Sequence, residues 1–406
     1  MSNKAPAIRF KGFTHAWEQR KLGEVVEKLK SYSLSRDVEI KEATGYRYIH
    51  YGDIHKQVAD IVTEDQQLPR IKAGDYESLE QGDLILADAS EDYTGIAEPC
   101  VILHKPKERI IAGLHTIAVR PQNINPLYLY YLFHTEKFKK FGNHVGTGLK
   151  VFGITFNNLS LFETKLPTLA EQTAIGNFFR TLDDAITLYK RKLDGLKELK
   201  KGYLQQMFPQ AGERVPRVRF AGFEGDWEVR KLGEVAEFNP RSVLPNIFEY
   251  VDLESVVGTS LISHRTENKN EAPSRAQRLA KRNDVFFQTV RPYQKHNYHF
   301  DLPFDNYVFS TGYAQLRPSV DSYFLFCQMQ DEIFVAKVLD RCTGTSYPAI
   351  NSTDLAEIEV CKAPEKAEQT AIGNFFRNLD EQITTQQTKL EKLKQLKSAY
   401  LQKMFV

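Results

Sequence analysis

Two stretches of the chain carry apolar residues at alternating steps of three and four positions. The first stretch has them at Leu182, Ile186, Tyr189, Leu193 and Leu196, and the second has them at Leu379, Ile383, Leu390 and Leu393. Steps of three and four place such side chains on one stripe of an α-helix. Each stripe continues for about three to four heptads, which is typical of a helix that packs against another long helix. The pattern therefore predicts a pair of long helices with these side chains in their interface.

The two helices are copies within one chain. Residues 171–180 return letter for letter as residues 368–377. A second duplication precedes each helix, because the sequence Trp-Glu-x-Arg-Lys-Leu-Gly-Glu-Val occupies both residues 17–25 and residues 227–235. Two unrelated helices would not share such lead-in sequences. Each half of the chain therefore follows one plan, with a fixed opening, a variable middle and a fixed helix.

The variable middles have the pattern of mixed α and β domains. Strands are predicted at residues 46–51, 84–86, 250–253 and 285–287, and short aromatic helices at residues 126–141 and 323–338. Gly52 and Asp53 are expected to end the first of these strands. Each middle has about 150 residues, a normal size for one domain. The predicted fold class is α+β, with domains at residues 1–168 and 213–366 and helical segments at residues 169–212 and 367–406.

Composition fits an ordinary soluble protein, with 406 residues, 42% hydrophobic and 26% charged. No apolar run approaches 18 residues and the N-terminus lacks a signal-peptide core, so we expect a cytoplasmic protein that does not enter a membrane. The four cysteines are far apart and are expected to be reduced. A net charge of +2 neither requires nor excludes nucleic acid, so any DNA-binding surface must come from local charge.

The sequence lacks the motifs of several common enzymes. It contains no G-x-x-x-x-G-K-S/T phosphate loop, and Gly146-x-Gly148 lacks the third glycine of the dinucleotide fingerprint. His296 and His299 lie three positions apart without the acidic partner of a zinc protease helix. We therefore predict a non-catalytic chain with no metal ion or cofactor of its own.

The second middle contains a loop with residues suited to DNA recognition. After the strand at residues 285–287 come the candidates Gln288, Arg291, Tyr293, Gln294, Lys295 and Asn297, and the later glycine-bearing loop adds Tyr347. Gln, Arg and Asn form paired hydrogen bonds with adenine and guanine edges, whereas Lys and Tyr suit phosphate and sugar. A polar surface hairpin is the alternative interpretation. The upstream cluster Arg275, Arg278, Lys281 and Arg282 is expected to be a solvated helix face or one that holds phosphate.

The corresponding loop of the first middle, residues 87–95, is acidic. It could accept a hydrogen bond from a cytosine amino group, and Ser90 and Tyr93 are its candidate contacts. Lys56 and Lys150, both expected in loops, are the candidates for phosphate. Two domains with the same fold that recognise different DNA sequences would differ in the residues of these loops.

Together these motifs resemble the specificity subunit of type I restriction–modification systems, over essentially the whole chain. The resemblance rests on the two openings, on the two Glu-Gln-x-x-Ile-x-x-Phe-Phe helix starts, and on helix tails at residues 202–208 and 398–405. It implies two target-recognition domains, each of which recognises one half of a bipartite, interrupted site in double-stranded DNA. The recognition domains of the family diverge widely, so no base-contacting residue carries over.

The resemblance also implies the partners. The two helices would form an antiparallel coiled coil that sets the spacing between the domains and docks methyltransferase subunits, two of which are expected. Restriction subunits would complete the complex. S-adenosylmethionine, ATP and Mg²⁺ are expected on those partners, and none of them on this chain.

A two-fold relation between equivalent domains on one DNA requires the second helix to run antiparallel to the first. About 37 helical residues span roughly 55 Å, longer than the roughly 34 Å turn of B-DNA. Lys200 and Lys397 interrupt the apolar stripes at matching positions and are interpreted as register devices or partner contacts. A metal-dependent nuclease with an unrecognised site and a coiled-coil adaptor for protein partners remain the alternative functions.

Overall fold

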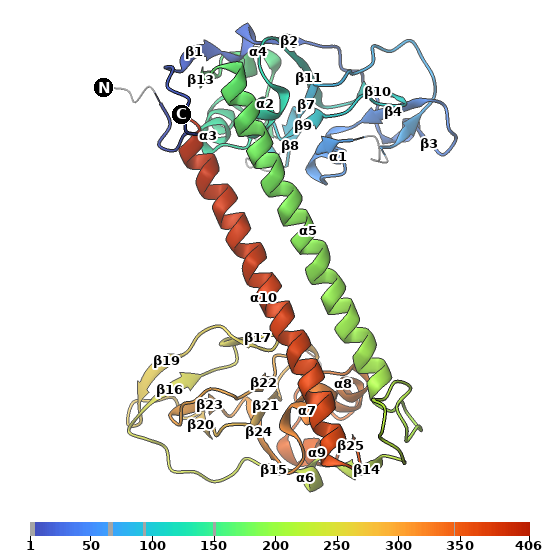
Figure 1. The fold of residues 1–406 in the computed structure, drawn as a ribbon, viewed down its shortest axis with the longest axis vertical. Helices are drawn as coiled ribbons and strands as arrows, with labels where there is room; N and C mark the ends of the chain where they lie inside the picture. Colours follow the sequence, from blue (N-terminus) through green and yellow to red (C-terminus); the bar gives the residue numbers. More distant parts are fainter. Residues whose placement is uncertain (1–4, 64–67, 92–94, 149–151, 345) are drawn as a thin grey trace. The chain divides into compact units, whose positions relative to one another are not determined.

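The computed structural model describes residues 5–63, 68–91, 95–148, 152–344 and 346–406. The chain forms two compact units (Figure 1). The first unit comprises residues 1–189 and 389–406, and the second comprises residues 190–388. The boundaries of these units fall inside the long helices. The reason is that each helix packs its two ends into the cores of different units.

The two predicted long helices are α5 (Leu169–Met207) and α10 (Lys366–Met404), each of 39 residues. In the first unit, the ring of Phe178 lies 5.1 Å from that of Tyr400, and Asp183 contacts Lys397. The residue number falls along α10 as it rises along α5, so the helix segments are antiparallel there. In the second unit, Lys200 contacts Asp380 and the ring of Tyr203 lies 5.0 Å from that of Phe375, so the helix segments are antiparallel there as well.

Both interrupting lysines make ion pairs between the helices. Lys200 Nζ lies 2.6 Å from a carboxylate oxygen of Asp380, and Lys397 Nζ lies 2.5 Å from one of Asp183. A tyrosine of the adjoining domain donates its hydroxyl proton to each carboxylate over 2.8 Å, from Tyr131 to Asp183 and from Tyr323 to Asp380. Each lysine therefore has a fixed partner, which agrees with the interpretation as a register device.

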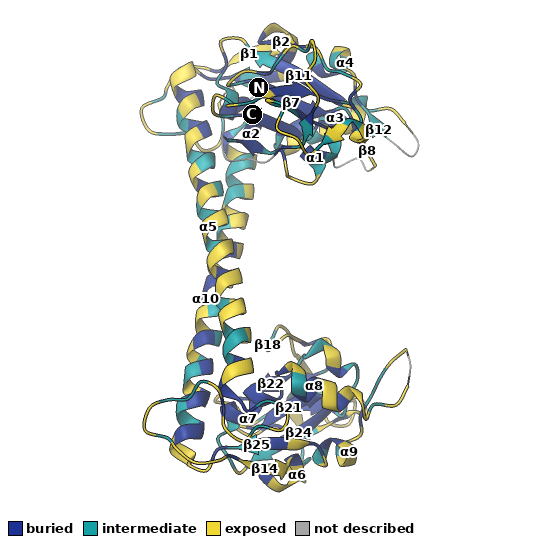
Figure 2. Cartoon of the chain, turned by 90° about the vertical axis from the view of Figure 1, so that its right-hand side faces the viewer, coloured by how far each residue is buried: buried dark blue, intermediate teal, exposed yellow. Residues whose placement is uncertain are grey.

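The predicted interface residues differ in their burial. Those that are buried are Leu182, Leu193, Leu379 and Leu390, and those that are partly exposed are Ile186, Tyr189, Leu196, Ile383 and Leu393. Within their own units, Leu196 and Leu393 pack against the domain cores. Buried and exposed positions alternate along both helices, as Figure 2 shows. The apolar stripe is thus fully covered at some of its positions and only partly at others.

The domain of the first unit is built on two main sheets. One has the order β2-β11-β7-β9-β5 (Val26–Lys28, Thr116–Pro121, Leu84–Ala87, Pro99–Ile102, Ile61–Val62), and the other has the order β10-β4-β6-β3 (Arg109–Ala112, Tyr46–Ile49, Arg70–Ile71, Glu39–Ile40). Two short pairs complete it: β1-β13 (Glu18–Lys21, Glu163–Leu166) and β12-β8 (Phe152–Gly153, Ala89–Ser90). The helices of this domain are α1 (Tyr51–His55), α2 (Pro126–Phe133), α3 (Glu136–Val145) and α4 (Phe156–Ser160), with 3-10 turns η1 (Leu22–Glu24) and η2 (Arg36–Val38).

The domain of the second unit repeats much of this topology. Its main sheets have the orders β15-β24-β21-β22 (Ala236–Phe238, Tyr313–Pro318, Val285–Gln288, Tyr298–His299) and β19-β16-β23-β20 (Arg265–Asn268, Ile247–Val251, Tyr307–Ser310, Ala276–Leu279). The short pairs are β14-β25 (Glu228–Lys231, Glu359–Lys362) and β17-β18 (Val256–Val257, Ser260–Leu261). The helices are α6 (Leu232–Val235), α7 (Ser322–Gln328), α8 (Glu332–Leu339) and α9 (Ser352–Ala356), with the 3-10 turn η4 (Pro292–Gln294).

The duplicated sequences join the opening of each half to the start of its helix. Arg9 binds the carboxylate of Glu171 through two nitrogens at 2.6 and 2.7 Å, and Arg219 binds Glu368 in the same way at 2.6 and 2.8 Å. Both carboxylates are almost completely buried. A buried carboxylate is costly unless it is paired, so these arginines and glutamates depend on each other. This pairing ties the segment just before each repeated opening to the start of its helix.

Three local predictions were wrong. Each predicted aromatic helix is two helices, because Thr135 and Asp331 begin a new helix within it. Gly52 and Asp53 lie inside α1 rather than in a turn, since the ring of His50 and the carboxylate of Asp53 form a capping box. The basic cluster around Arg278 lies on and beside strand β20 rather than on a helix, because its backbone pairs with β23.

Candidate nucleic-acid interface

Two loops of the second unit join into one surface. The first follows β21 and contains η4, and the second includes residues 343–344 and 346–350. The backbone N–H of Arg291 donates to the carbonyl of Pro348 over 2.8 Å, and that of Ile350 donates to the carbonyl of Thr289 over 3.0 Å. A β-bridge links Val290 to Ala349. The polar segment that the sequence singled out is therefore fixed to the glycine-bearing loop that precedes α9.

Gln288 and Asn297 hold this loop from within. Gln288 is 3% exposed, and its side-chain amide donates to Gln294 over 3.0 Å while its oxygen accepts from the N–H of His296 over 3.2 Å. Asn297 is fully buried and accepts from the N–H of Gln288 over 2.8 Å. The amide nitrogen of Asn297 is buried and has no hydrogen-bond partner among the described residues. Both side chains support the loop from within, and their contact with bases stays a prediction.

Lys295 is engaged within the protein as well. Its ammonium lies 2.6 Å from a carboxylate oxygen of Glu332 and donates to the carbonyl of Gln330 over 3.0 Å. The charge predicted to contact phosphate is thus compensated at the start of α8. Gln294 is half-buried, with its side-chain oxygen bonded to Gln288. Among the predicted residues of this loop, Tyr293 is exposed, and Arg291 and Gln294 are half-buried.

Arg291 stacks on a tyrosine from the neighbouring loop. Its guanidinium carbon lies 4.4 Å from the centre of the ring of Tyr347, which is 62% exposed. Arg291 has a φ of +55° and Lys295 a φ of +54°. Residues other than glycine seldom adopt such angles, at a cost of about 1–3 kcal/mol each, and they persist where the surroundings enforce them. The surrounding hydrogen bonds therefore hold Arg291 in a defined place.

In the first unit, a cavity of about 710 Å³ brings two predicted residues together. Lys56 follows α1 and is exposed, and Ser90 lies buried at the end of β8, yet both line this cavity. Arg36 and Lys139 add further positive charge to its wall, which also includes Glu98 and Glu91, the latter from the acidic loop. Tyr93 and Lys150, the other candidates of this domain, lie outside the described residues.

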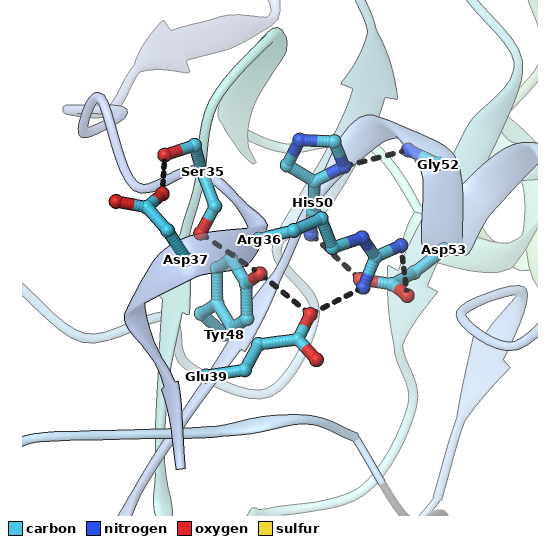
Figure 3. A network of polar contacts seen from close by, with 8 residues as sticks. All are labelled: Ser35, Arg36, Asp37, Glu39, Tyr48, His50, Gly52 and Asp53. Atoms are coloured by element: carbon cyan, nitrogen blue, oxygen red, sulfur yellow. Dashed lines mark hydrogen bonds and ion pairs between the residues drawn. The ribbon is translucent and has the colours of Figure 1, made fainter.

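A polar network fixes the wall of this cavity (Figure 3). Arg36 donates to Asp53 over 2.8 Å and to Glu39 over 2.7 Å, and Glu39 also accepts from the hydroxyl of Tyr48 over 2.8 Å. His50 accepts from the N–H of Gly52 over 3.1 Å. Burial and the nearby guanidinium lower the pKa of His50, which keeps its ring neutral and able to accept this bond.

Sequence reasoning missed the histidines of this cavity. His50, Tyr51 and His55 line it, and all three belong to α1 or its cap. The missing signal was the spacing of His50 and Asp53, which matches a residue that caps a helix followed three positions later by an acid. The strand predicted at residues 46–51 is confirmed as β4 up to Ile49, and only its last two residues belong to the cap and first turn of α1.

Two α+β domains on one plan, each followed by a long helix, define a duplicated protein with a candidate recognition surface in each unit. The chain belongs to the family of the type I restriction modification DNA specificity domain, whose model matches residues 15–198 and 224–395. No helix in the described part of the chain is long and apolar enough to cross a membrane. The described residues also contain no group of three or more His, Cys, Asp or Glu side chains that could hold a metal ion.

Individual proteins are similar to this chain at low identity. The type I restriction enzyme HindI specificity subunit of Haemophilus influenzae is 21% identical over 190 residues, which is 45% of this chain and 41% of that protein. The aligned part thus spans about two fifths of the length of this curated relative.

Solved structures confirm the fold. The S subunit of a type I restriction–modification system from M. genitalium has a TM-score of 0.63 at 14% identity, with 99% of each chain covered. A chain from a study of complex assembly and conformational transition of the type I R-M system has a TM-score of 0.51 at 19% identity, with 96% of this chain and 97% of that chain covered.

Proposed function

We propose that this chain is the DNA-recognition subunit of a type I restriction–modification complex, in which each unit recognises one half of an interrupted site. The observation that carries the proposal is the duplication of one scaffold with different surfaces. The first unit presents a cavity with Lys56 and Ser90, and the second presents Arg291 stacked on Tyr347. Equivalent domains with unlike contact residues are suited to two unlike half-sites.

The long helices have the second role in this proposal. They set the distance between the half-sites and dock two methyltransferase subunits, which restriction subunits join. S-adenosylmethionine, ATP and Mg²⁺ belong to those partners, and this chain catalyses no step. Family membership and the absence of the corresponding sequence motifs support this division of labour.

A domain exchange tests the proposal. Residues 236–366 are replaced by the equivalent segment of another family member, and methylation-aware sequencing determines the modified motif in cells that also produce the methyltransferase. We expect one half-site to change while the other half-site is retained. The matched control exchanges the corresponding middle of the first half and should change the opposite half-site. A change in both halves after either exchange would contradict independent recognition.

The purified chain alone separates this function from that of an enzyme. Incubated with DNA and Mg²⁺, or with DNA and S-adenosylmethionine, it should neither cut nor methylate. Cleavage by the lone chain would favour the nuclease alternative. Failure to bind DNA even together with the methyltransferase would favour the adaptor.

A further inference from the structure

Arg291 differs from Arg265, another arginine that lies over a tyrosine ring in the second unit, in what its nitrogen atoms contact. Arg265 lies over the ring of Tyr250 at 4.7 Å, but it also donates to Glu267 over 2.6 Å and to Asp252 over 2.7 Å. Arg291 lies over Tyr347 at 4.4 Å, and none of the ion pairs among the described residues includes it. A contact with an aromatic ring uses none of the hydrogen-bond donors of the guanidinium, so its N–H groups remain available to a ligand.

We propose that Arg291 recognises a guanine in the half-site bound by the second unit; this inference rests on the proposed function. The O6 and N7 atoms of guanine are two acceptors side by side on the major-groove edge. A planar guanidinium matches them with two parallel hydrogen bonds, and this is the commonest specific contact between a protein and a base.

The loop is ordered before any ligand arrives. The backbone of Arg291 is anchored to Pro348, and the buried amides of Gln288 and Asn297 hold the segment from within. Tyr347 then restricts the guanidinium itself. Because these restraints already limit the side chain, little rotational freedom is lost on binding, and a misplaced base edge is not accommodated by movement of the loop.

The surroundings of Arg291 favour a base over a phosphate. Phosphate contacts are usually supplied by several cations or backbone N–H groups acting together. Here the nearest lysine in the loop, Lys295, is already paired with Glu332, and the exposed neighbours Tyr293 and Tyr347 are uncharged. A single fork-shaped donor beside an aromatic ring is better suited to one base edge.

The experiment uses the complete complex with its methyltransferase and measures binding to DNA that carries its motif. In each duplex one guanine of the second half-site is replaced by 7-deazaguanine, which lacks the N7 acceptor but still pairs with cytosine. We expect one replacement to weaken binding of the unaltered complex. The Arg291→Gln complex should instead be insensitive to that same replacement.

Methylation-aware sequencing supplies the second measurement. Arg291→Gln and Arg291→Lys should both relax the motif at that one G·C pair, by roughly 5- to 150-fold in preference. Arg291→Lys keeps the charge but loses the fork, so its relaxation separates hydrogen-bond geometry from charge. Arg265→Gln is the matched control, because its stacked guanidinium is occupied by carboxylates, and it should leave the motif unchanged.

Several outcomes would overturn the inference while leaving the proposed function intact. The first is an unaltered complex that tolerates 7-deazaguanine at every guanine of the second half-site. The second is an Arg291 variant whose motif relaxes at an A·T pair or in the first half-site. The third is an equal loss of binding at all sites, which would mark a phosphate contact. An unaltered complex with no bipartite preference would instead refute the proposed function itself.

Discussion

The ion pair between Lys200 and Asp380 allows a direct test of how the long helices are held in register. Lys200 Nζ lies 2.6 Å from the carboxylate of Asp380, and the two side chains are 15% and 16% exposed. The hydroxyl of Tyr323 donates to the other carboxylate oxygen over 2.8 Å. Lys200→Met keeps most of the length of the side chain but removes its charge, which leaves Asp380 with Tyr323 alone.

The expected loss follows from the burial of the pair. Removing one partner of a fully buried pair costs about 3–5 kcal/mol, and a hydrogen bond to a charged group contributes about 1.5–3 kcal/mol. Asp380 keeps the hydrogen bond from Tyr323 and some contact with water, so the expected loss lies in the range for a hydrogen bond to a charged group rather than in that for a fully buried pair. We expect Lys200→Met to lower the free energy of unfolding of the second unit by about 2 kcal/mol.

The two tryptophans make the measurement specific to one unit. Trp17 is buried in the first unit and Trp227 in the second. In a Trp17→Phe background, fluorescence during urea unfolding reports on the second unit through Trp227. Lys201→Met is the matched control, because Lys201 is exposed and appears in none of the ion pairs of the described residues. It should change stability by less than about 0.5 kcal/mol.

A double variant completes the cycle. Lys200→Met with Asp380→Asn leaves no unpaired charge and should recover part of the lost stability. The reasoning is refuted if Lys200→Met costs no more than Lys201→Met, because the buried carboxylate would then not depend on its partner.

Two further predictions concern pH and the repeat. Burial lowers the pKa of His299 to about 4, so the unfolded chain binds more protons than the folded chain below about pH 6.5. The free energy of unfolding of the second unit should therefore fall by up to about 3 kcal/mol between pH 6.5 and 4. A His299→Gln variant with the same pH dependence in urea unfolding would contradict this. A chain that ends at Phe208 retains both Asp183 and Lys200, which occupy the two complementary positions of the helix pair, and should dimerise through them. Light scattering should show a dimer for this fragment and a monomer for its Asp183→Lys variant. The double variant Asp183→Lys with Lys200→Asp should form the dimer again. A monomeric parent fragment would show that the two halves are not interchangeable.

The sequence by itself determined the plan of this protein. Apolar residues three and four positions apart established α5 and α10, and the helices begin within a few residues of the duplicated Glu-Gln at 171–172 and 368–369. The turns at Gly82 and Asn283, each followed by a buried strand, were also correct. Such features depend on neighbours close in sequence or on the comparison of one half with the other, so they are visible in the letters alone.

The tertiary structure decided which polar residues face outward. Gln288, Arg291 and Lys295 are equally polar in sequence, but Gln288 is buried in support of the loop and Lys295 is paired with Glu332, which lies 37 positions away. Arg291 gains its place from Tyr347, on a different loop. The side chain that a polar residue meets is set by how distant segments pack, and composition and spacing within one segment do not contain that information.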